Sequence, residues 1–120
     1  MLDKLKILLI IVMLTPVAFA QNVITVTDAD ISPGESYTMT SNNTYLLDGF
    51  VFVEDGSVLN IEAGTIVKGK AEPTTGNNAS ALIIAQGGQI FAEGPAELTI
   101  IFTAQVDDIN DPNDLTHSDR

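Results

Sequence analysis

Hydrophobic and polar positions along this chain change over in short stretches, and glycine- or aspartate-centred turns separate the mostly apolar runs. Residues 50–53, 58–61 and 65–67 are such runs, with turns at 54–56 and 62–64 between them. β-Branched residues dominate the runs, and this composition favours strands. Beyond Ala20, no stretch long enough for a helix shows the helical apolar period. The pattern predicts an all-β fold.

A partial sequence repeat predicts how the strands are arranged. Residues 53–64 resemble residues 84–94, and most corresponding positions keep the interval that separates Gly56 from Gly87. Repeats of about 20–50 residues are typical of stacked folds, in which each unit covers the apolar side of its neighbour. We therefore predict a parallel β-helix, with a β-sandwich of similarly spaced strands as the alternative. The predicted stacked pairs are Leu59 with Ile90 and Ile61 with Ala92.

The predicted coil divides the chain into regions. Residues 21–45 are polar and are interpreted as an N-terminal cap, residues 46–103 as the β-helix coils, and residues 104–120 as an acidic loop and tail. Nothing in that tail reads as a strand that could cover the last coil. We therefore expect a fragment of a longer protein, or a chain whose C-terminal edge a continuation or partner covers. The predicted inward residues are Phe52, Leu59, Ile61, Ile66, Leu82, Ile84, Ile90, Ala92, Ile100 and Phe102.

Residues 1–20 have the three parts of a signal peptide. Lys4 and Lys6 provide the positive start, residues 7–14 are continuously apolar, and a small-x-small motif precedes a cleavage site between Ala20 and Gln21. A membrane-spanning helix, the alternative, needs about 18 or more apolar residues. We expect a secreted or cell-surface protein with no membrane span after removal of the signal.

Composition narrows the possible partners. The 120-residue chain has no cysteine, so disulfide bonds cannot stabilise it, and its formal net charge is −11. Beyond the signal peptide its cations are Lys68, Lys70 and Arg120. Binding to nucleic acid requires clustered Lys and Arg that neutralise phosphates. The charge therefore excludes nucleic acid as a partner and leaves divalent cations, glycans and other proteins.

Three segments carry a resemblance to a known group. Residues 47–56, the L-x-I-x-x-G-T motif at 59–65, and residues 81–103 with their G-G-x-I-x-A-x-G run resemble the start of secreted cell-surface proteins from Bacteroidota-type bacteria. The resemblance implies a right-handed parallel β-helix and a location outside the cell. These relatives are longer than this chain and continue with a Trp-Gly-Gly-containing coil. The resemblance implies little about activity.

The acidic loop is the strongest candidate for a metal site. Ca²⁺ binds several carboxylate and amide oxygens, and residues 107–114 offer them densely. The loop lacks the glycine and distal glutamate of an EF-hand. A solvated loop between two coils is the alternative interpretation. The candidate calcium ligands are Asp107, Asp108, Asn110, Asp111 and Asp114.

The sequence offers no recognisable catalytic set. A nucleophilic triad needs a base such as histidine, and the single histidine, His117, lies in the tail. Carboxylates that could act on glycosidic bonds occur mostly in turns. We expect a non-catalytic structural or adhesive β-helix module that binds surface glycans or proteins. The alternative is the N-terminal portion of a carbohydrate-active β-helix enzyme, a polysaccharide lyase or hydrolase.

Overall fold

The computed structural model describes residues 21–114. The predicted signal peptide at 1–20 and the tail residues 115–120, with His117, lie outside the described residues. The described chain forms nine strands and one short 3₁₀ helix, η1 (Asp28–Asp30). The strands are β1 (Asn22–Val26), β2 (Ser36–Met39), β3 (Asn43–Leu47), β4 (Phe50–Val53), β5 (Val58–Ile61), β6 (Ile66–Gly69), β7 (Ala81–Ile84), β8 (Gln89–Ala92) and β9 (Ile101–Ala104).

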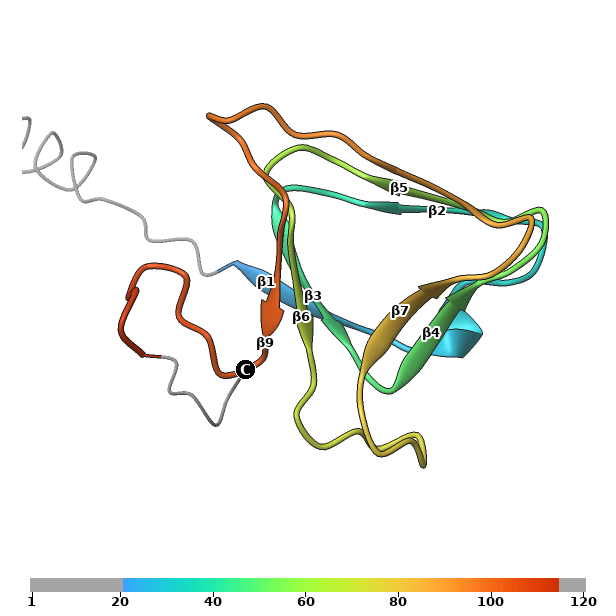
Figure 1. The fold of residues 1–120 in the computed structure, drawn as a ribbon, viewed down its shortest axis with the longest axis horizontal. Helices are drawn as coiled ribbons and strands as arrows, with labels where there is room; N and C mark the ends of the chain where they lie inside the picture. The colour runs from blue at the N-terminus through green and yellow to red at the C-terminus, as the bar shows by residue number, and fades with distance from the viewer. Residues whose placement is uncertain (1–20, 115–120) are drawn as a thin grey trace, which may run out of the picture.

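The strands form three parallel sheets, with orders β1-β3-β6-β9, β2-β5-β8 and β4-β7. The chain visits the three sheets in turn, so the coil has a triangular outline (Figure 1). Every strand pairing among the described residues is parallel. The predicted all-β parallel β-helix is confirmed, and the β-sandwich alternative, which requires antiparallel sheets, is wrong.

The predicted stacking of coils is also confirmed. In the pairing of β5 with β8, Leu59 is the register partner of Ile90, and Ile61 is the partner of Ala92. Because strand residues alternate between two faces, this register directs all four side chains to the same side of the sheet. The repeat seen in the sequence therefore corresponds to one turn of the coil at this sheet.

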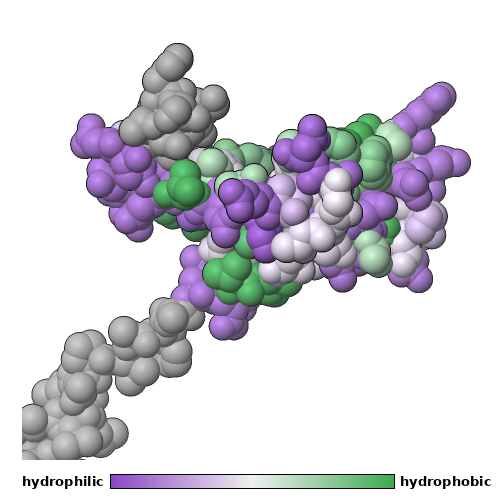
Figure 2. Space-filling view, turned by 90° about the horizontal axis from the view of Figure 1, so that it is seen from below, coloured by the Kyte–Doolittle hydropathy of each residue, from purple (hydrophilic) through white to green (hydrophobic). Residues whose placement is uncertain are grey.

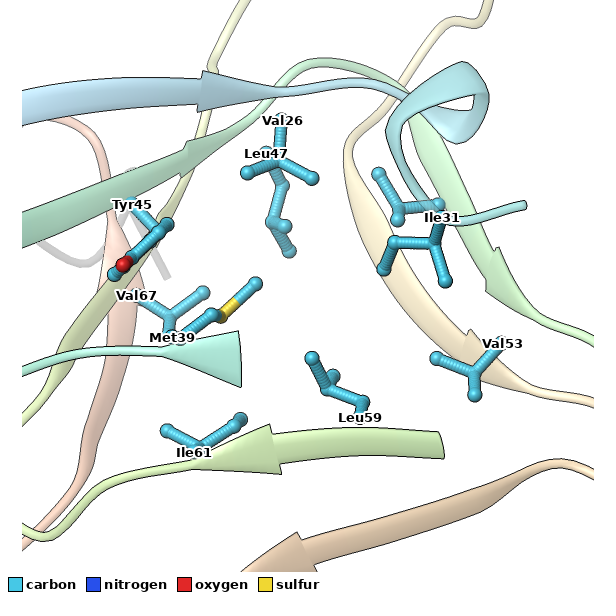
Figure 3. Packing of buried hydrophobic residues seen from close by; sticks show 10 residues of the cluster. Val26, Ile31, Met39, Tyr45, Leu47, Val53, Leu59, Ile61 and Val67 are labelled. Atoms are coloured by element: carbon cyan, nitrogen blue, oxygen red, sulfur yellow. The ribbon is translucent and has the colours of Figure 1, made fainter. Parts of the chain in front are cut away.

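The core runs along the inside of the coil. Figure 3 shows Val26 beside Leu47, and Met39 pointing into the same interior as Leu59. Two residues that were predicted to face the interior, Phe52 of β4 and Ile66 of β6, are not among the buried ones. The buried hydrophobic residues are Val26, Ile31, Met39, Tyr45, Leu47, Val51, Val53, Leu59, Ile61 and Val67.

Phe52 and Ile66 were predicted to face inward, and this prediction is wrong. Their neighbours Val51, Val53 and Val67 are the buried residues, so strand alternation places Phe52 and Ile66 on the outer side. All four residues of β4 are apolar, and a run that is apolar at every position does not reveal which alternate pair faces the core. The other eight predicted residues occupy inward positions or pack against the core.

The apolar interior is covered at the N-terminal end of the coil, where Val26, Ile31 and Met39 are buried. The region 21–45, predicted as a cap, contains β1 and β2, which pair with β3 and β5. Between them, Ile31 fills the interior near Val53 (Figure 3). η1 lies beside β4, where the backbone N–H of Phe52 donates a hydrogen bond to Asp28 Oδ1 at 2.9 Å. This turn therefore provides an acceptor at the edge of β4.

Polar residues and tight corners complete the outer surface. Figure 2 shows polar side chains over much of one side, with separate apolar patches between them. At the corner between β3 and β4, Gly49 has a φ of +86°, which glycine adopts without the steric penalty of other residues. The only helix in residues 21–114 is η1, which is far shorter than the about 20 residues needed to cross a membrane.

Candidate functional site

A hollow of about 290 Å³ lies at the edge of the β2-β5-β8 sheet, where β5 and β8 end. Asn60 and Phe91 are register partners on these two strands. Their neighbours in sequence face the core, so strand alternation directs both side chains outward. The lining residues are Asn60, Ile61, Glu62, Ala63, Phe91 and Glu93.

Phe91 is the most distinctive residue of the hollow. Its relative exposure is 53 %, which is unusual for a large aromatic residue. It belongs to an outward column in which the preceding partners are Thr38 and Asn60. An aromatic ring therefore stands on a strip of short polar side chains, with one flank open to solvent.

Two carboxylates line the same hollow. Glu62 directly follows β5 and Glu93 directly follows β8, and the residues before them, Ile61 and Ala92, are register partners. Neighbouring strands of a sheet lie about 4.8 Å apart, so the two glutamates leave the sheet one coil apart. Ser41 N–H donates a hydrogen bond to Glu62 Oε2 at 3.1 Å, which holds this carboxylate toward the β2–β3 turn.

The hollow combines chemistry suited to a sugar. An exposed aromatic ring offers an apolar face, and amide and carboxylate groups beside it can bond to hydroxyl groups. Binding sites of this type place a few polar groups around an apolar contact. Two carboxyl groups on neighbouring coils are also the functional groups that glycosidases use. The arrangement can thus bind a sugar, and its two carboxyl groups are the smallest set with which a glycosidase could act.

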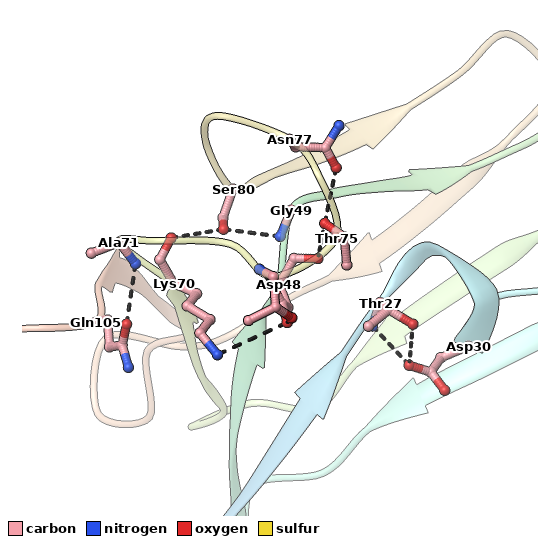
Figure 4. Close-up of polar contacts among 11 residues, drawn as sticks. Thr27, Asp30, Asp48, Gly49, Lys70, Ala71, Thr75, Asn77, Ser80 and Gln105 are labelled. Atoms are coloured by element: carbon pink, nitrogen blue, oxygen red, sulfur yellow. Dashed lines mark hydrogen bonds and ion pairs between the residues drawn. The ribbon is translucent and has the colours of Figure 1, made fainter.

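A buried carboxylate lies at another corner but serves the fold. Asp48 accepts hydrogen bonds from Thr74 N–H at 2.7 Å and from Thr74 Oγ1 at 2.5 Å. Lys70 Nζ lies 3.9 Å from the same carboxylate (Figure 4). The two hydrogen bonds from Thr74, and then the charge of Lys70, lower the pKa of Asp48. These contacts hold the loop 70–80 against the corner, so Asp48 is committed to structure.

The predicted calcium ligands lie on one loop that turns back on itself. Asp107 Oδ2 accepts a 2.5 Å bond from Thr103 Oγ1, and Asp108 Oδ1 accepts one from Asn110 N–H at 3.0 Å. Asp111 Oδ1 accepts from Asn113 N–H at 2.9 Å, and Asp114 accepts from the backbone of Asp108. Within residues 21–114, no three carboxylate or imidazole groups converge to hold a metal ion. The calcium site stays a prediction, and the carboxylates of the loop accept hydrogen bonds from the loop itself and from Thr103 of β9.

The three-sheet coil corresponds to a described domain family. Residues 31–114 match the family of pectate-lyase-like β-helix domains. The chain belongs to this family. Comparisons with curated proteins and with solved structures gave no match. A pectate-lyase-like β-helix domain is a scaffold, and a scaffold does not by itself determine an activity.

The hollow of this pectate-lyase-like β-helix domain was missed by the sequence analysis, although a signal for it was present. Asn60 and Phe91 are separated by the interval of the repeat, as are Glu62 and Glu93. The repeat was used to align inward residues only. Applied to the outward residues, the same interval places an aromatic residue and two carboxylates on one corner of the coil.

Proposed function

We propose that the protein is a non-catalytic β-helix module of a secreted or cell-surface protein, and that the hollow around Phe91 binds surface glycans. The exposure of Phe91 carries this proposal. The ring lies in a hollow that amide and carboxylate groups also line, and an apolar contact with a few polar groups around it is the usual composition of a ligand site. A stacked β-helix also holds such a ring on a rigid backbone, which lowers the entropic cost of binding.

Glycans fit this surface better than acidic macromolecules. The net charge of −11 disfavours anionic partners, and the hollow itself carries Glu62 and Glu93. A neutral sugar can stack an apolar ring face on Phe91 while its hydroxyl groups donate to the two carboxylates. The proposal that the module is non-catalytic is supported by composition, because the chain has no cysteine and its single histidine is His117.

A carbohydrate-active enzyme is the second candidate, because of the pair Glu62 and Glu93. Retaining glycosidases hold two carboxyl groups about 5–5.5 Å apart, a spacing that neighbouring strands can supply. In this case one glutamate would protonate the leaving oxygen and the other would attack the sugar. The pair would then need a substrate bound across both coils, in the same hollow.

The test separates binding from catalysis. The chain without its signal peptide is screened against arrayed glycans, and hits are measured by NMR titration. We expect Phe91→Ala to abolish binding, whereas Val23→Ala, at an exposed apolar residue of β1 outside the hollow, leaves it unchanged. Absence of binding to any glycan, or equal loss in both variants, would contradict the glycan proposal.

Incubation with neutral and acidic polysaccharides tests the second candidate. The proposed module releases no new reducing ends and no unsaturated products. Release that disappears in Glu62→Gln and in Glu93→Gln, with unchanged circular dichroism, would replace the non-catalytic proposal by the enzymatic one.

A further inference from the structure

The hollow around Phe91 carries negative charge that its own lining does not balance. Its two ionisable residues are Glu62 and Glu93, and none of its lining residues is a lysine or an arginine. Among residues 21–114 the only cationic side chains are Lys68 and Lys70. A pair of carboxylates without a cation beside it favours a ligand that brings a positive charge of its own.

Both of these lysines are engaged elsewhere on the coil. Lys68 lies on β6, and its Nζ donates a hydrogen bond to Asp107 O at 2.6 Å. Lys70 follows β6, and its Nζ lies 3.9 Å from Asp48 Oδ2 (Figure 4). β6 belongs to the β1-β3-β6-β9 sheet, whereas the hollow lies at the end of β5 and β8 in another sheet. Within the described chain, the charge of the hollow is therefore left for a ligand to neutralise.

The groups that line the hollow are placed to act on one cation together. Glu62 and Glu93 are both exposed, and Ser41 N–H binds one oxygen of Glu62, which leaves its other oxygen open to a ligand. Phe91 lies two residues before Glu93, about 6.6 Å along an extended chain. The face of an aromatic ring attracts an ammonium group within about 6 Å of its centre. One amine can thus contact the ring and a carboxylate at the same time.

The size of the hollow limits the ligand to a small unit. Pockets for drug-sized ligands have volumes of about 300–1,000 Å³. The volume here is about 290 Å³, which suits a single monosaccharide unit. The hollow lies between two coils that the structure describes, since Asn60 and Glu62 belong to one coil and Phe91 and Glu93 to the next.

We infer that the hollow selects an amino sugar whose amine is free and protonated. This inference rests on the proposed glycan binding and names the class of sugar. The apolar face of the sugar ring packs on Phe91, and the ammonium group lies beside the carboxylates of Glu62 and Glu93. The Asn60 amide, on the same outward face, bonds to a hydroxyl group of the sugar.

Two other kinds of ligand fit the hollow less well. An acidic sugar would bring a third carboxylate beside Glu62 and Glu93, and like charges in contact repel each other. A lysine side chain of a protein partner would supply the same positive charge as an amino sugar. However, it has no hydroxyl groups for Asn60, and its long flexible chain loses more conformational freedom when it is held.

The test compares sugars that differ only in the amine. Oligosaccharides of glucosamine and of galactosamine are each paired with the neutral glucose or galactose oligomer of the same linkage and length. The chain without its signal peptide is titrated with each sugar and followed by NMR. We expect the amino sugar of at least one pair to bind roughly tenfold tighter at low ionic strength. The preference should disappear at about 1 M salt, where the Debye length is about 3 Å.

Matched variants separate the hollow from the overall negative charge. Glu62→Gln combined with Glu93→Gln should bring the affinity ratio of amino sugar to neutral sugar close to one. Glu72→Gln, at an exposed residue of the loop 70–80 outside the hollow, should leave the ratio as it is in the parent chain. Phe91→Ala should weaken the binding of every sugar that binds.

The outcomes distinguish this inference from the proposal on which it rests. Equal affinity for both members of each pair, lost in Phe91→Ala, would overturn the amino-sugar inference and leave glycan binding in place. A preference for the amine that Glu72→Gln lowers as much as the hollow variants do would also overturn it, because the attraction would then come from net charge. If none of the sugars binds and a lysine-containing peptide shifts the Phe91 resonances, both proposals are wrong and the partner is a protein.

Discussion

Truncation of Leu59 and of Ile90 compares a covered and an open position of the same column. The two residues are register partners on β5 and β8, and their relative exposures are 0 % and 36 %. Replacing either by alanine removes the same number of carbon atoms. The chemical change is thus nearly the same, and the surroundings differ by one coil.

The expected costs follow from burial. At about 0.8 kcal/mol per buried methylene, Leu59→Ala loses about 2.4 kcal/mol of transfer free energy. The closed cavity left behind raises the total to about 3–5 kcal/mol. Ile90 already has 36 % of its surface exposed, and truncation there leaves no closed cavity. We therefore expect Ile90→Ala to cost about 1.5 kcal/mol, which is the buried share of the same transfer term.

Urea denaturation followed by circular dichroism measures both values, with a common slope fitted to the variants and the parent chain. Small domains have about 5–15 kcal/mol in total, so Leu59→Ala takes a large part of the stability. Ile61→Val, at a buried position on the same strand, provides a milder check with an expected cost of about 0.5–1.5 kcal/mol.

Equal costs for Leu59→Ala and Ile90→Ala would refute the reasoning, because Ile90 would then be as well covered in solution as Leu59. A cost below about 1 kcal/mol for Leu59→Ala would show that the β5 column is not part of a packed core. A large difference in the expected direction supports both the stacking and the open last coil.

Four further predictions test the corners, the loop and the export signal. The lowered pKa of Asp48 means that its contribution to stability is present above the unfolded pKa of about 3.9 and is lost as pH falls below it. Between pH 5 and 2, the melting temperature should therefore fall more steeply for the parent than for Asp48→Asn. Gly34→Ala should cost about 1–2 kcal/mol, because Gly34 has a φ of +80°. Gly88→Ala should destabilise the chain by clearly more, because a Cβ at Gly88 would overlap a backbone oxygen. Urea denaturation compares the two variants. If the calcium hypothesis holds, millimolar Ca²⁺ raises the melting temperature of the parent and not of Asp108→Asn. Mass spectrometry of protein exported from a bacterial host should find Gln21 as the first residue, and an intact Met1 would contradict the signal peptide.

The stacking of coils was predictable because glycine corners fix the phase of the repeat. Gly56 and Gly87 occupy the same place in the two copies, both have positive φ, and Gly56 N–H donates to Gly87 O at 3.1 Å. With the corners aligned, the inward residues of β5 and β8 follow by alternation. Phe52 was misplaced because alternation in the fully apolar run 50–53 does not show which alternate pair faces the core. Ile66 could have been placed correctly, because Lys68, two residues further along β6, lies on the same face and marks it as the outer one.

The remaining features depend on contacts between distant segments. Asp48 reads in the sequence as an ordinary turn residue before glycine, and its role depends on Thr74, which is 26 residues away. Its hydrogen bonds arise only when the loop 70–80 folds back over the corner. Alternation within single strands carries no information about such a return.

Differences in the length of the corners explain which coils the sequence repeat detected and which it missed. The interval from Tyr37 to its register partner Leu59 is shorter than the interval from Leu59 to the next partner, Ile90. The longer coil contains the loop 70–80, which lies at a corner and leaves the strand register intact. A search at one interval therefore detects only coils of equal length, and β1 and β2 escape it. Because corners can lengthen without disturbing the stacked core, they are where a β-helix can acquire a binding function, and the hollow beside Phe91 lies at such a corner.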